Sequence, residues 1–375
     1  LTGMSASIAR ATTMFTAIAI SILVNRKSGT INALFISAFL LLLIHPLYLF
    51  DIGFQLSYLA VFSIVYFNPI FDKLWRPKNK IIRYLFKIFT VSISAQIGIL
   101  PLSLYYFHQF PALFFISGLV VLPVLGILLL LGFFVILLAY FDILPNVIAT
   151  LYSFLIEQLN QFILFISKQE DFIFKQLYFS FLMLISTYVI IIVFYRLIKL
   201  YSYKRLALFL ISILSFQLVL FYEKYFRESK KEFIVFNHSK NTIIGIRNGK
   251  NFVINHSPDT LLKNTFLNEY LIGTGVSINK TKKKIKNYYT FNKHKILVID
   301  SLSIYKMDAL KPDILVLRNS PKINLERVIK IVKPQSVVVD ASNYTSYTKY
   351  YKQKSAEMNT KFYNTKQNGA FILKR

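Results

Sequence analysis

Residues 51–67 read DIGFQLSYLAVFSIVYF, in which an acid, a glycine and an amide precede a strongly apolar run. No charged residue follows Asp51 until Asp72, so the run has the roughly 20 residues that a helix needs to cross a membrane. We predict a spanning helix here, with Asp51 as a charge at its N-terminus and Gly53 in a turn. A second interpretation is that Asp51 and Gln55, one helical turn apart, face a water-filled path.

Uncharged runs of similar length recur through the first part of the chain. They predict membrane segments over 11–24, 31–50, 54–71, 88–107, 177–195 and 206–222. Residues 112–141 carry no charge but are interrupted by Gly118, Pro123 and Gly126, which favours a broken or re-entrant pair. Residues 144–166 keep one apolar face, as an interfacial or bundle-packed helix does. We expect a polytopic α-helical membrane protein with about 7–8 membrane segments.

Charge and hydrophobicity are separated along the chain. The 375 residues are 55% hydrophobic, yet the formal net charge is +27. Residues 1–222 carry 15 Lys and Arg against 6 Asp and Glu, whereas residues 223–375 carry 29 against 11. We therefore predict a membrane domain over 1–222 and a basic, soluble domain over 223–375. The chain has no cysteine, which excludes disulfides, thiolate metal sites and a cysteine nucleophile.

Basic residues in the short loops predict the orientation of the spans. The positive loops lie at Arg26-Lys27, at Lys73 to Lys87 and at Arg196 to Arg205, whereas the loops near Asp51, His108 and Asp142 are not positive. Loops rich in Lys and Arg face the cytoplasm. The hairpin 177–222 then begins and ends outside, which places the C-terminal domain on the outer face of the membrane. This assignment requires residues 112–166 to cross the membrane an even number of times.

From residue 233 onward, short β-rich runs replace the long apolar ones. Predicted strands lie within 233–238, 241–256, 295–300, 313–318, 336–342 and 370–375. Asn248-Gly249 stands between two alternating runs and predicts a β-hairpin. Residues 323–332 have helical spacing and lie between two strand-like runs, which indicates a β-α-β unit. We expect a soluble α/β domain.

Several motifs resemble those of the ComEC-type competence-protein family. They are Gly3 to Ala11, Pro46, Gly53-Phe-Gln-Leu-Ser57, Gly98-Ile-Leu-Pro101, Tyr106-Phe-His-Gln-Phe-Pro111 and Pro123. The resemblance implies an inner-membrane channel that passes single-stranded DNA into the cytoplasm during natural transformation. Family members begin with a soluble OB-like domain and further spans, so we expect this chain, which opens on Leu1, to be the C-terminal portion of such a protein. The expected partners are single-stranded DNA, membrane lipids, other competence proteins and further copies of the chain.

The C-terminal domain resembles the metallo-β-lactamase-like domain with which the family often ends, in degenerate form. Asn255-His256-Ser257 stand where Asp-x-Gly is usual, and Arg318-Asn-Ser320 where His-His-Gly-Ser is usual, while Asp300 matches the metal-bridging aspartate. A binuclear metal hydrolase needs clustered His and carboxylate ligands to hold ions that activate water. His238, His256 and His294 are dispersed. We therefore expect no metal, no cofactor, no catalytic residue and no enzymatic activity.

Two sets of residues are candidates for contact with DNA. The first could line a path through the membrane and comprises Arg10, Asp51, Gln55, Ser57 and Gln96. Gln and Ser also serve as interhelical hydrogen-bonding partners, and Arg10 could instead reach the membrane interface. The second set lies in the basic, aromatic loop 280–295 and comprises Lys282, Lys283, Lys284, Tyr288 and Tyr289.

The composition of loop 280–295 suits a platform for single-stranded DNA, in which aromatic rings stack on bases. It is equally compatible with a solvated loop that binds nothing. Two alternatives to a channel stay open at this point. One is a membrane-anchored, metal-dependent nuclease that acts on incoming DNA. The other is a truncated, non-catalytic membrane module.

Overall fold

The computed structural model describes residues 11–16, 19–20, 30–238, 241–256, 265–278, 284–305 and 311–374. The chain forms two compact units, Leu1–Val219 and Leu220–Arg375, called here the membrane domain and the C-terminal domain. Three predicted site residues lie outside the described residues, namely Arg10, Lys282 and Lys283.

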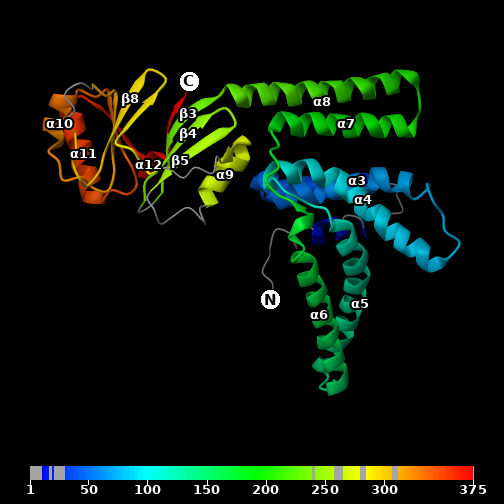
Figure 1. Ribbon diagram of the computed structural model, residues 1–375. Coiled ribbons are helices and arrows are strands. Elements are labelled where there is room, and N and C mark those ends of the chain that lie inside the picture. The colour runs from blue at the N-terminus through cyan, green and yellow to red at the C-terminus, as the bar shows by residue number, and fades with distance from the viewer. Residues whose placement is uncertain are drawn as a thin grey trace. The chain divides into compact units, whose positions relative to one another are not determined.

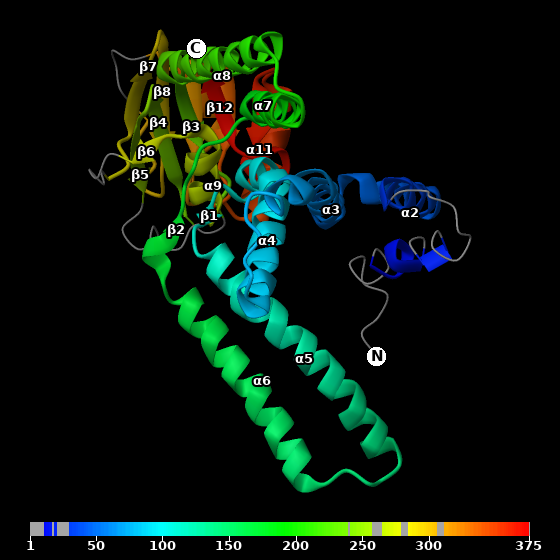
Figure 2. The ribbon, with the colours of Figure 1, turned by 90° about the vertical axis from the view of Figure 1, so that its right-hand side faces the viewer.

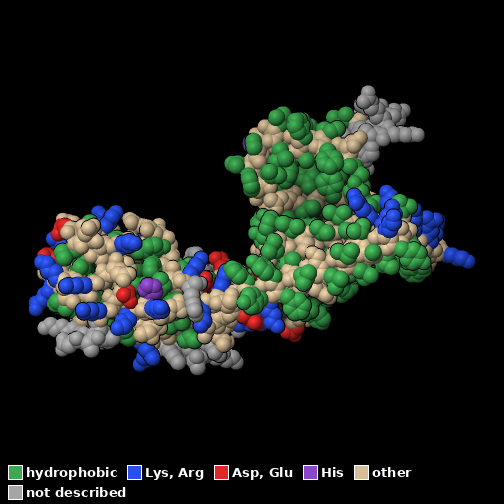
Figure 3. Space-filling view, turned by 90° about the horizontal axis from the view of Figure 1, so that it is seen from above, with side chains coloured by type: hydrophobic (Ala, Val, Ile, Leu, Met, Phe, Trp, Pro, Cys, Tyr) green, Lys and Arg blue, Asp and Glu red, His purple; other side chains and the backbone are tan. Residues whose placement is uncertain are grey.

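The described part of the membrane domain is built from long apolar helices, which confirms the prediction of a polytopic helical membrane protein (Figure 1). Among the described residues, six helices are long and apolar enough to span a membrane: α3 (Ile52–Phe71), α4 (Lys80–Phe107), α5 (Phe114–Tyr140), α6 (Asn146–Ser167), α7 (Phe181–Lys199) and α8 (Tyr203–Ser229). The exposed faces of these helices are largely hydrophobic, whereas Lys and Arg are spread over the C-terminal domain (Figure 3).

The helix before α3 is shorter than predicted. Residues 31–50 were expected to form one span, but α2 (Thr30–Ile44) stops at His45 and a 3-10 helix, η1 (Pro46–Phe50), follows. The physical reason is Pro46, whose ring disfavours helical geometry at the preceding residue. His45 accordingly has φ −134° and ψ 84°. The apolar run therefore turns before it reaches α3.

The prediction that residues 112–141 form a broken or re-entrant pair is wrong. Helix α5 runs without interruption from Phe114 to Tyr140 with Pro123 inside it. A break in hydrocarbon would leave several backbone groups without partners, whereas one proline removes a single hydrogen bond. Helix α6 returns beside α5 as an antiparallel hairpin (Figure 2).

A short antiparallel ladder closes the base of this hairpin. Strands β1 (Phe110–Pro111) and β2 (Ile173–Phe174) pair with each other. The ladder is extended by Ala112 N, which donates to Phe172 O at 2.9 Å, and by Leu177 N, which donates to His108 O at 2.9 Å. Two-residue strands with a proline give no sequence signal, so this ladder was not predicted. It holds both ends of the α5–α6 hairpin together.

Helices α3 and α4 pack closely through small residues. A Cβ atom added to Gly98 would lie 2.6 Å from Ser63 Cβ and 2.7 Å from Leu59 O. Ser63 Oγ also donates to Ser94 O at 2.5 Å. Small residues of this kind let two membrane helices approach closely, and buried hydroxyls then join them. The α3–α4 pair forms the centre of the membrane domain.

The described residues of the C-terminal domain form two five-stranded sheets (Figure 1). The first has the order β12 (Phe371–Lys374), β3 (Lys231–Val235), β4 (Ile243–Asn248), β5 (Asn251–His256) and β6 (Ser277–Ile278). The second has the order β11 (Lys361–Asn364), β10 (Ser336–Val339), β9 (Ile314–Leu317), β8 (His294–Ile299) and β7 (Tyr288–Phe291). Strands β8 to β11 are parallel, and β7 is antiparallel to β8.

Apolar residues from both sheets form a buried core between them, which includes Phe233, Ile244, Ile296 and Val316. Helices α10 (Leu325–Val332) and α11 (Thr345–Glu357) cover the outer face of the second sheet. Helix α9 (Thr265–Thr274) covers the outer face of the first. The remaining helix, α12 (Thr365–Asn368), is one turn long and follows β11. The prediction of a soluble α/β domain is confirmed, with four layers in the order helix, sheet, sheet, helix.

Two local predictions in this domain are confirmed. The hairpin at Asn248-Gly249 forms, since Asn248 pairs with Asn251 and Gly249 has φ +62°. A positive φ is the conformation that glycine tolerates best. The predicted helix over 323–332 is α10, which lies between the parallel strands β9 and β10. Its first turn is capped by Asn324, whose side chain accepts a hydrogen bond from Arg327 N.

Candidate functional site

Asp51 caps helix α3. Its Oδ1 accepts a hydrogen bond from Phe54 N at 2.6 Å, and the helix begins at Ile52. The side chain of an N-cap residue satisfies one of the free amides of the first turn. The predicted helix start is therefore confirmed, but Gly53 lies within the helix and the turn expected there is wrong. The cap gives Asp51 a structural role.

Gln55 joins three elements at the same end of α3. Its Nε2 donates to Leu49 O of η1 at 2.8 Å, and its Oε1 accepts from the Tyr106 hydroxyl of α4 at 3.3 Å. Ser57 donates to Phe54 O of its own helix at 3.0 Å. These contacts are the interhelical and local hydrogen bonds that polar residues commonly make in membrane bundles.

Gln96 lies nearer the middle of its helix than Gln55 does. It is half-buried on α4 and has no hydrogen-bond partner among the residues that the structure describes. Ten residues of α4 separate Gln96 from Tyr106, the partner of Gln55, which corresponds to about 15 Å along the helix. The four predicted path residues that the structure describes therefore form no single cluster: Asp51, Gln55 and Ser57 gather at one end of α3, and Gln96 stands apart.

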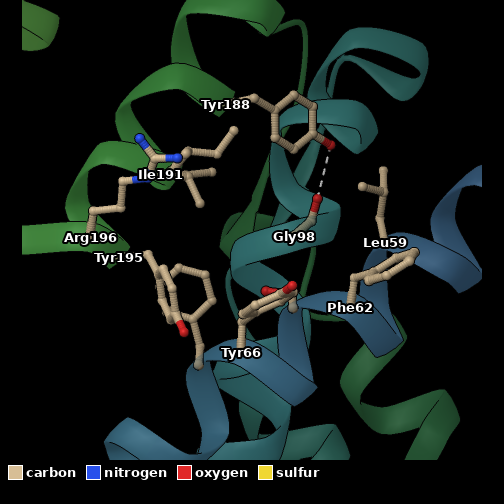
Figure 4. Close-up of a pocket in the computed structure, with 11 residues that line it drawn as sticks. Leu59, Phe62, Tyr66, Gly98, Tyr188, Ile191, Tyr195 and Arg196 are labelled. Atoms are coloured by element: carbon tan, nitrogen blue, oxygen red, sulfur yellow. Dashed lines mark hydrogen bonds between the residues drawn. The ribbon is translucent and has the colours of Figure 1, made fainter. Parts of the chain in front are cut away.

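A groove that sequence reasoning missed lies between α3, α4 and α7 (Figure 4). It has a volume of about 410 Å³ and is lined mainly by apolar and aromatic side chains, among them Tyr66, Tyr188 and Tyr195, with Arg196 also in its wall. The Tyr188 hydroxyl donates to Gly98 O at 2.9 Å, which ties α7 to α4. No local sequence pattern could have revealed it, because its walls come from three helices far apart in the sequence.

In the C-terminal domain, polar side chains meet where the parallel strands end. Arg318, after β9, pairs with Asp300, after β8: Arg318 Nη2 lies 3.3 Å from Asp300 Oδ2, and the two side chains are 14% and 13% exposed. Asp300 Oδ1 also accepts from Leu302 N at 3.0 Å. Because the carboxyl ends of neighbouring parallel strands lie at one edge, the sequence could have predicted this pair.

A second carboxylate, Asp340, lies at the end of β10. It accepts hydrogen bonds from the hydroxyls of Thr242 and Ser342 and from Asn343 Nδ2. Burial raises the pKa of the Asp340 carboxyl above its ordinary value, although the two hydroxyls and the charge of Arg318 oppose the shift. Asn343 Oδ1 in turn accepts from Ser320 N at 2.8 Å. The network thus connects the loops that follow β9 and β10.

These residues do not fit a binuclear metal centre. The Asp300 carboxylate, which matches the family's metal-bridging aspartate, is paired with a guanidinium, and Asp340 is enclosed by hydrogen-bond donors. Among the described residues no three His, Cys, Asp or Glu side chains come close enough together to hold a metal ion. A permanently charged arginine beside Asp300 opposes the approach of a second cation.

The described part of the basic loop differs from a simple exposed platform. Lys284 is exposed and Tyr288 is half-buried, but Tyr289 is 6% exposed and packs in the core between the sheets. The Tyr289 hydroxyl accepts from Asn255 Nδ2 at 3.0 Å and from Lys286 N at 2.9 Å, and burial raises its pKa. The prediction that Tyr289 stacks on bases is therefore wrong, because alternation along β7 directs its ring inward.

Comparison with known proteins identifies the family. The model of the family described as "Competence protein" matches residues 1–200. The chain belongs to the ComEC-type competence-protein family. A second family model, "ComEC C-terminal domain", matches residues 233–375, so the match extends to both domains.

One curated relative is ComE operon protein 3 of Bacillus subtilis (strain 168), which is 36% identical over 110 residues. The match covers 29% of this chain and 13% of the length of that relative. No solved structure matches the chain. Membership of the ComEC-type family, together with the six long apolar helices of the described part of the chain, indicates a multi-pass membrane protein.

Proposed function

We propose that the chain forms part of the path by which single-stranded DNA crosses the cytoplasmic membrane during natural transformation. The observation that carries this proposal is the match of the membrane helices to the competence family. A polyanion can cross hydrocarbon only along a hydrated, polar or cationic path. The bundle supplies polar side chains inside otherwise apolar helices, which is the composition that such a path requires.

Within this proposal, Gln96 is the strongest candidate for the path. Its amide is half-buried in the middle of α4 and is free of hydrogen bonds to other described residues, so it can bind water or a phosphate. Gln55 contributes at the end of the path, where the Tyr106 hydroxyl holds its amide. Asp51 and Ser57 support that end as a helix cap and a local hydrogen bond. Arg10 is a further candidate for contact with a phosphate of the DNA.

The proposed orientation places the C-terminal domain on the outer side of the inner membrane. In this orientation the α5–α6 hairpin would cross the membrane twice, and the ladder between β1 and β2, which holds both ends of the hairpin together, supports this. The basic connections after α3 and α7 then share the cytoplasmic side, as the positive-inside rule requires. The short loop at Asp142 also falls on the cytoplasmic side, which differs from the assignment made from its lack of positive charge.

We further propose that the C-terminal domain acts without hydrolysing DNA. The Asp300–Arg318 pair and the enclosed Asp340 support this, because both carboxylates are engaged within the protein. The basic loop, with Lys282, Lys283, Lys284 and Tyr288, would bind the phosphates and bases of incoming DNA. The proposed partners are therefore single-stranded DNA, other competence proteins and further copies of the chain.

Natural transformation of a host that carries this gene tests the proposal. Gln96→Leu should lower the yield of transformants while the protein still inserts in normal amounts. Gln161→Leu is the matched control, because Gln161 is exposed on α6 and should leave the yield unchanged. Equal yields for wild type and Gln96→Leu would remove Gln96 from the path, and normal transformation in a strain lacking the gene would refute the function itself.

A further inference from the structure

The groove between α3, α4 and α7 is polar at one end only. Its walls are the side chains of Leu59, Phe62, Tyr66, Phe67 and Ile192, with Tyr188 and Ser63 nearer the centre of the bundle. The cation Arg196 lies in its wall in the last turn of α7. Figure 4 shows the rings of Tyr66 and Tyr195 together on one side of the groove and Tyr188 pointing at Gly98. The groove is therefore amphipathic.

Positive charge gathers at the Arg196 end. Lys199 follows one turn later, with its Nζ 5.7 Å from the centre of the Tyr195 ring, and Lys204 and Arg205 begin the next helix. The connection after α3 adds Lys73, Arg76 and Lys78 against the single acid Asp72. An anionic group at the end of the groove thus meets an excess of positive charge.

The aromatic side chains of the groove pack against one another and against the bundle. The Tyr195 ring packs edge-on against Tyr66 and Phe67, with ring centres 5.3 Å and 5.5 Å apart. Tyr188 is fixed by its hydrogen bond to Gly98 O. Because these side chains hold one another in place, the groove is preformed. Its side chains therefore lose little conformational entropy when a ligand binds.

We propose that this groove binds a phospholipid with an anionic headgroup, its phosphate beside Arg196 and one acyl chain between the rings. An acyl chain suits apolar walls, and a phosphate suits an arginine at the boundary of the membrane. Single-stranded DNA suits the groove less well, because its phosphates would need polar partners along the whole length. Neither Gln55 nor Gln96 lines the groove. The proposed lipid site is therefore separate from the proposed DNA path.

Lipid retention by the purified full chain tests this proposal. The protein in detergent is incubated with phosphatidylglycerol or with phosphatidylcholine, and bound lipid is counted by native mass spectrometry. We expect wild type to retain phosphatidylglycerol preferentially. Arg196→Gln should reduce that retention about fivefold, the effect of one basic residue near an anionic lipid surface. Lys168→Gln, which removes one positive charge at the end of α6 and outside the groove, should change it little.

A second pair of variants tests the apolar part. Ile192 lines the groove and is 54% exposed, so Ile192→Trp should fill the space without disturbing the core and should lower retention of both lipids. Ile198→Trp, on the same helix but outside the groove, is the matched control. Equal retention of the two lipids by wild type, unchanged retention in both Arg196→Gln and Ile192→Trp, or displacement of lipid by a short single-stranded oligonucleotide would overturn the proposal.

Discussion

Arg318 Nη2 lies 3.3 Å from Asp300 Oδ2 at the carboxyl ends of the adjacent parallel strands β9 and β8. Asp300 is the residue that matches a metal-bridging aspartate in the family resemblance. A guanidinium from the neighbouring strand thus supplies the positive charge that a metal ion would supply at this edge. The C-terminal domain keeps the sandwich of two sheets while its strand ends are joined by side-chain contacts.

Removing this guanidinium should destabilise the C-terminal domain. Arg318→Gln leaves the Asp300 carboxylate largely buried without its ionic partner, which should lower the free energy of unfolding by about 1–3 kcal/mol. The midpoint of thermal unfolding of the full chain in detergent measures the effect. Lys330→Gln is the control, because the Lys330–Glu326 pair is exposed, and it should leave the midpoint unchanged. A saturable rise of the wild-type midpoint with Mn²⁺ or Zn²⁺ would contradict this account of the site.

Asp340 should make the stability of this domain fall as pH rises. Burial raises its pKa in the folded state above the ordinary value of 3.8. The protonated form is therefore favoured on folding, and the associated stability is complete below that ordinary value and is lost as pH rises through the folded pKa. Asp340→Asn mimics the protonated side chain and should flatten this dependence in urea unfolding between acidic and neutral pH. An identical pH profile for the two proteins would show that another group causes it.

Gly98 should be required for the packing of α3 on α4. In Gly98→Ala the new Cβ would lie within 3.0 Å of Ser63 Cβ and of Leu59 O, so a backbone shift is needed. We expect a loss of about 1–3 kcal/mol, measured as a lower unfolding midpoint in detergent. Gly126→Ala is the matched control, because nothing lies within 4 Å of its added Cβ and the change should be tolerated. Equal midpoints for the two variants would refute the close approach.

Substitutions at Tyr288 and at Tyr289 should affect different properties, the affinity for DNA at Tyr288 and the stability of the domain at Tyr289. Tyr289→Phe removes a buried hydroxyl that accepts from Asn255 and from Lys286 N, so it should lower stability by about 1 kcal/mol and leave DNA affinity unchanged. Tyr288→Ala should weaken binding of a single-stranded oligonucleotide, by about 1–3 kcal/mol if the ring stacks on a base. Fluorescence anisotropy measures the affinity. Unchanged affinity in Tyr288→Ala would make the loop a solvated segment.

Local signals predicted the C-terminal domain well. Asn248-Gly249 predicted the hairpin correctly because glycine tolerates the positive φ of the turn. The spacing of apolar residues in 323–332 predicted α10 correctly because the apolar face of this helix covers a sheet. Tyr289 was assigned wrongly because a basic neighbourhood in the sequence does not show which face of a strand a ring occupies. Only the pairing of β7 with β8 directs it inward.

The membrane domain was harder to predict where tertiary contacts decide the outcome. Uncharged runs placed α3, α4, α7 and α8, since length and composition alone define a span. Pro123 suggested a break in α5, but the hydrocarbon penalises free backbone groups more than it penalises one proline. The ladder of Phe110 with Phe174 and the groove beside Arg196 depend on segments far apart in the sequence, so no local pattern reported them.

Accessibility of Gln96 to water during DNA uptake tests the central claim most directly. The chain has no cysteine, so Gln96→Cys introduces the only thiol, and Leu129→Cys on α5, where Leu129 is 68% exposed, provides a lipid-facing control. Competent cells of the transformable host are labelled with a membrane-impermeant maleimide before and after addition of transforming DNA. The account predicts that Gln96→Cys is labelled, that incoming DNA protects it, and that Leu129→Cys is labelled in neither condition. Labelling of Gln96→Cys no greater than that of Leu129→Cys, or labelling unaffected by DNA, would contradict a path along α4.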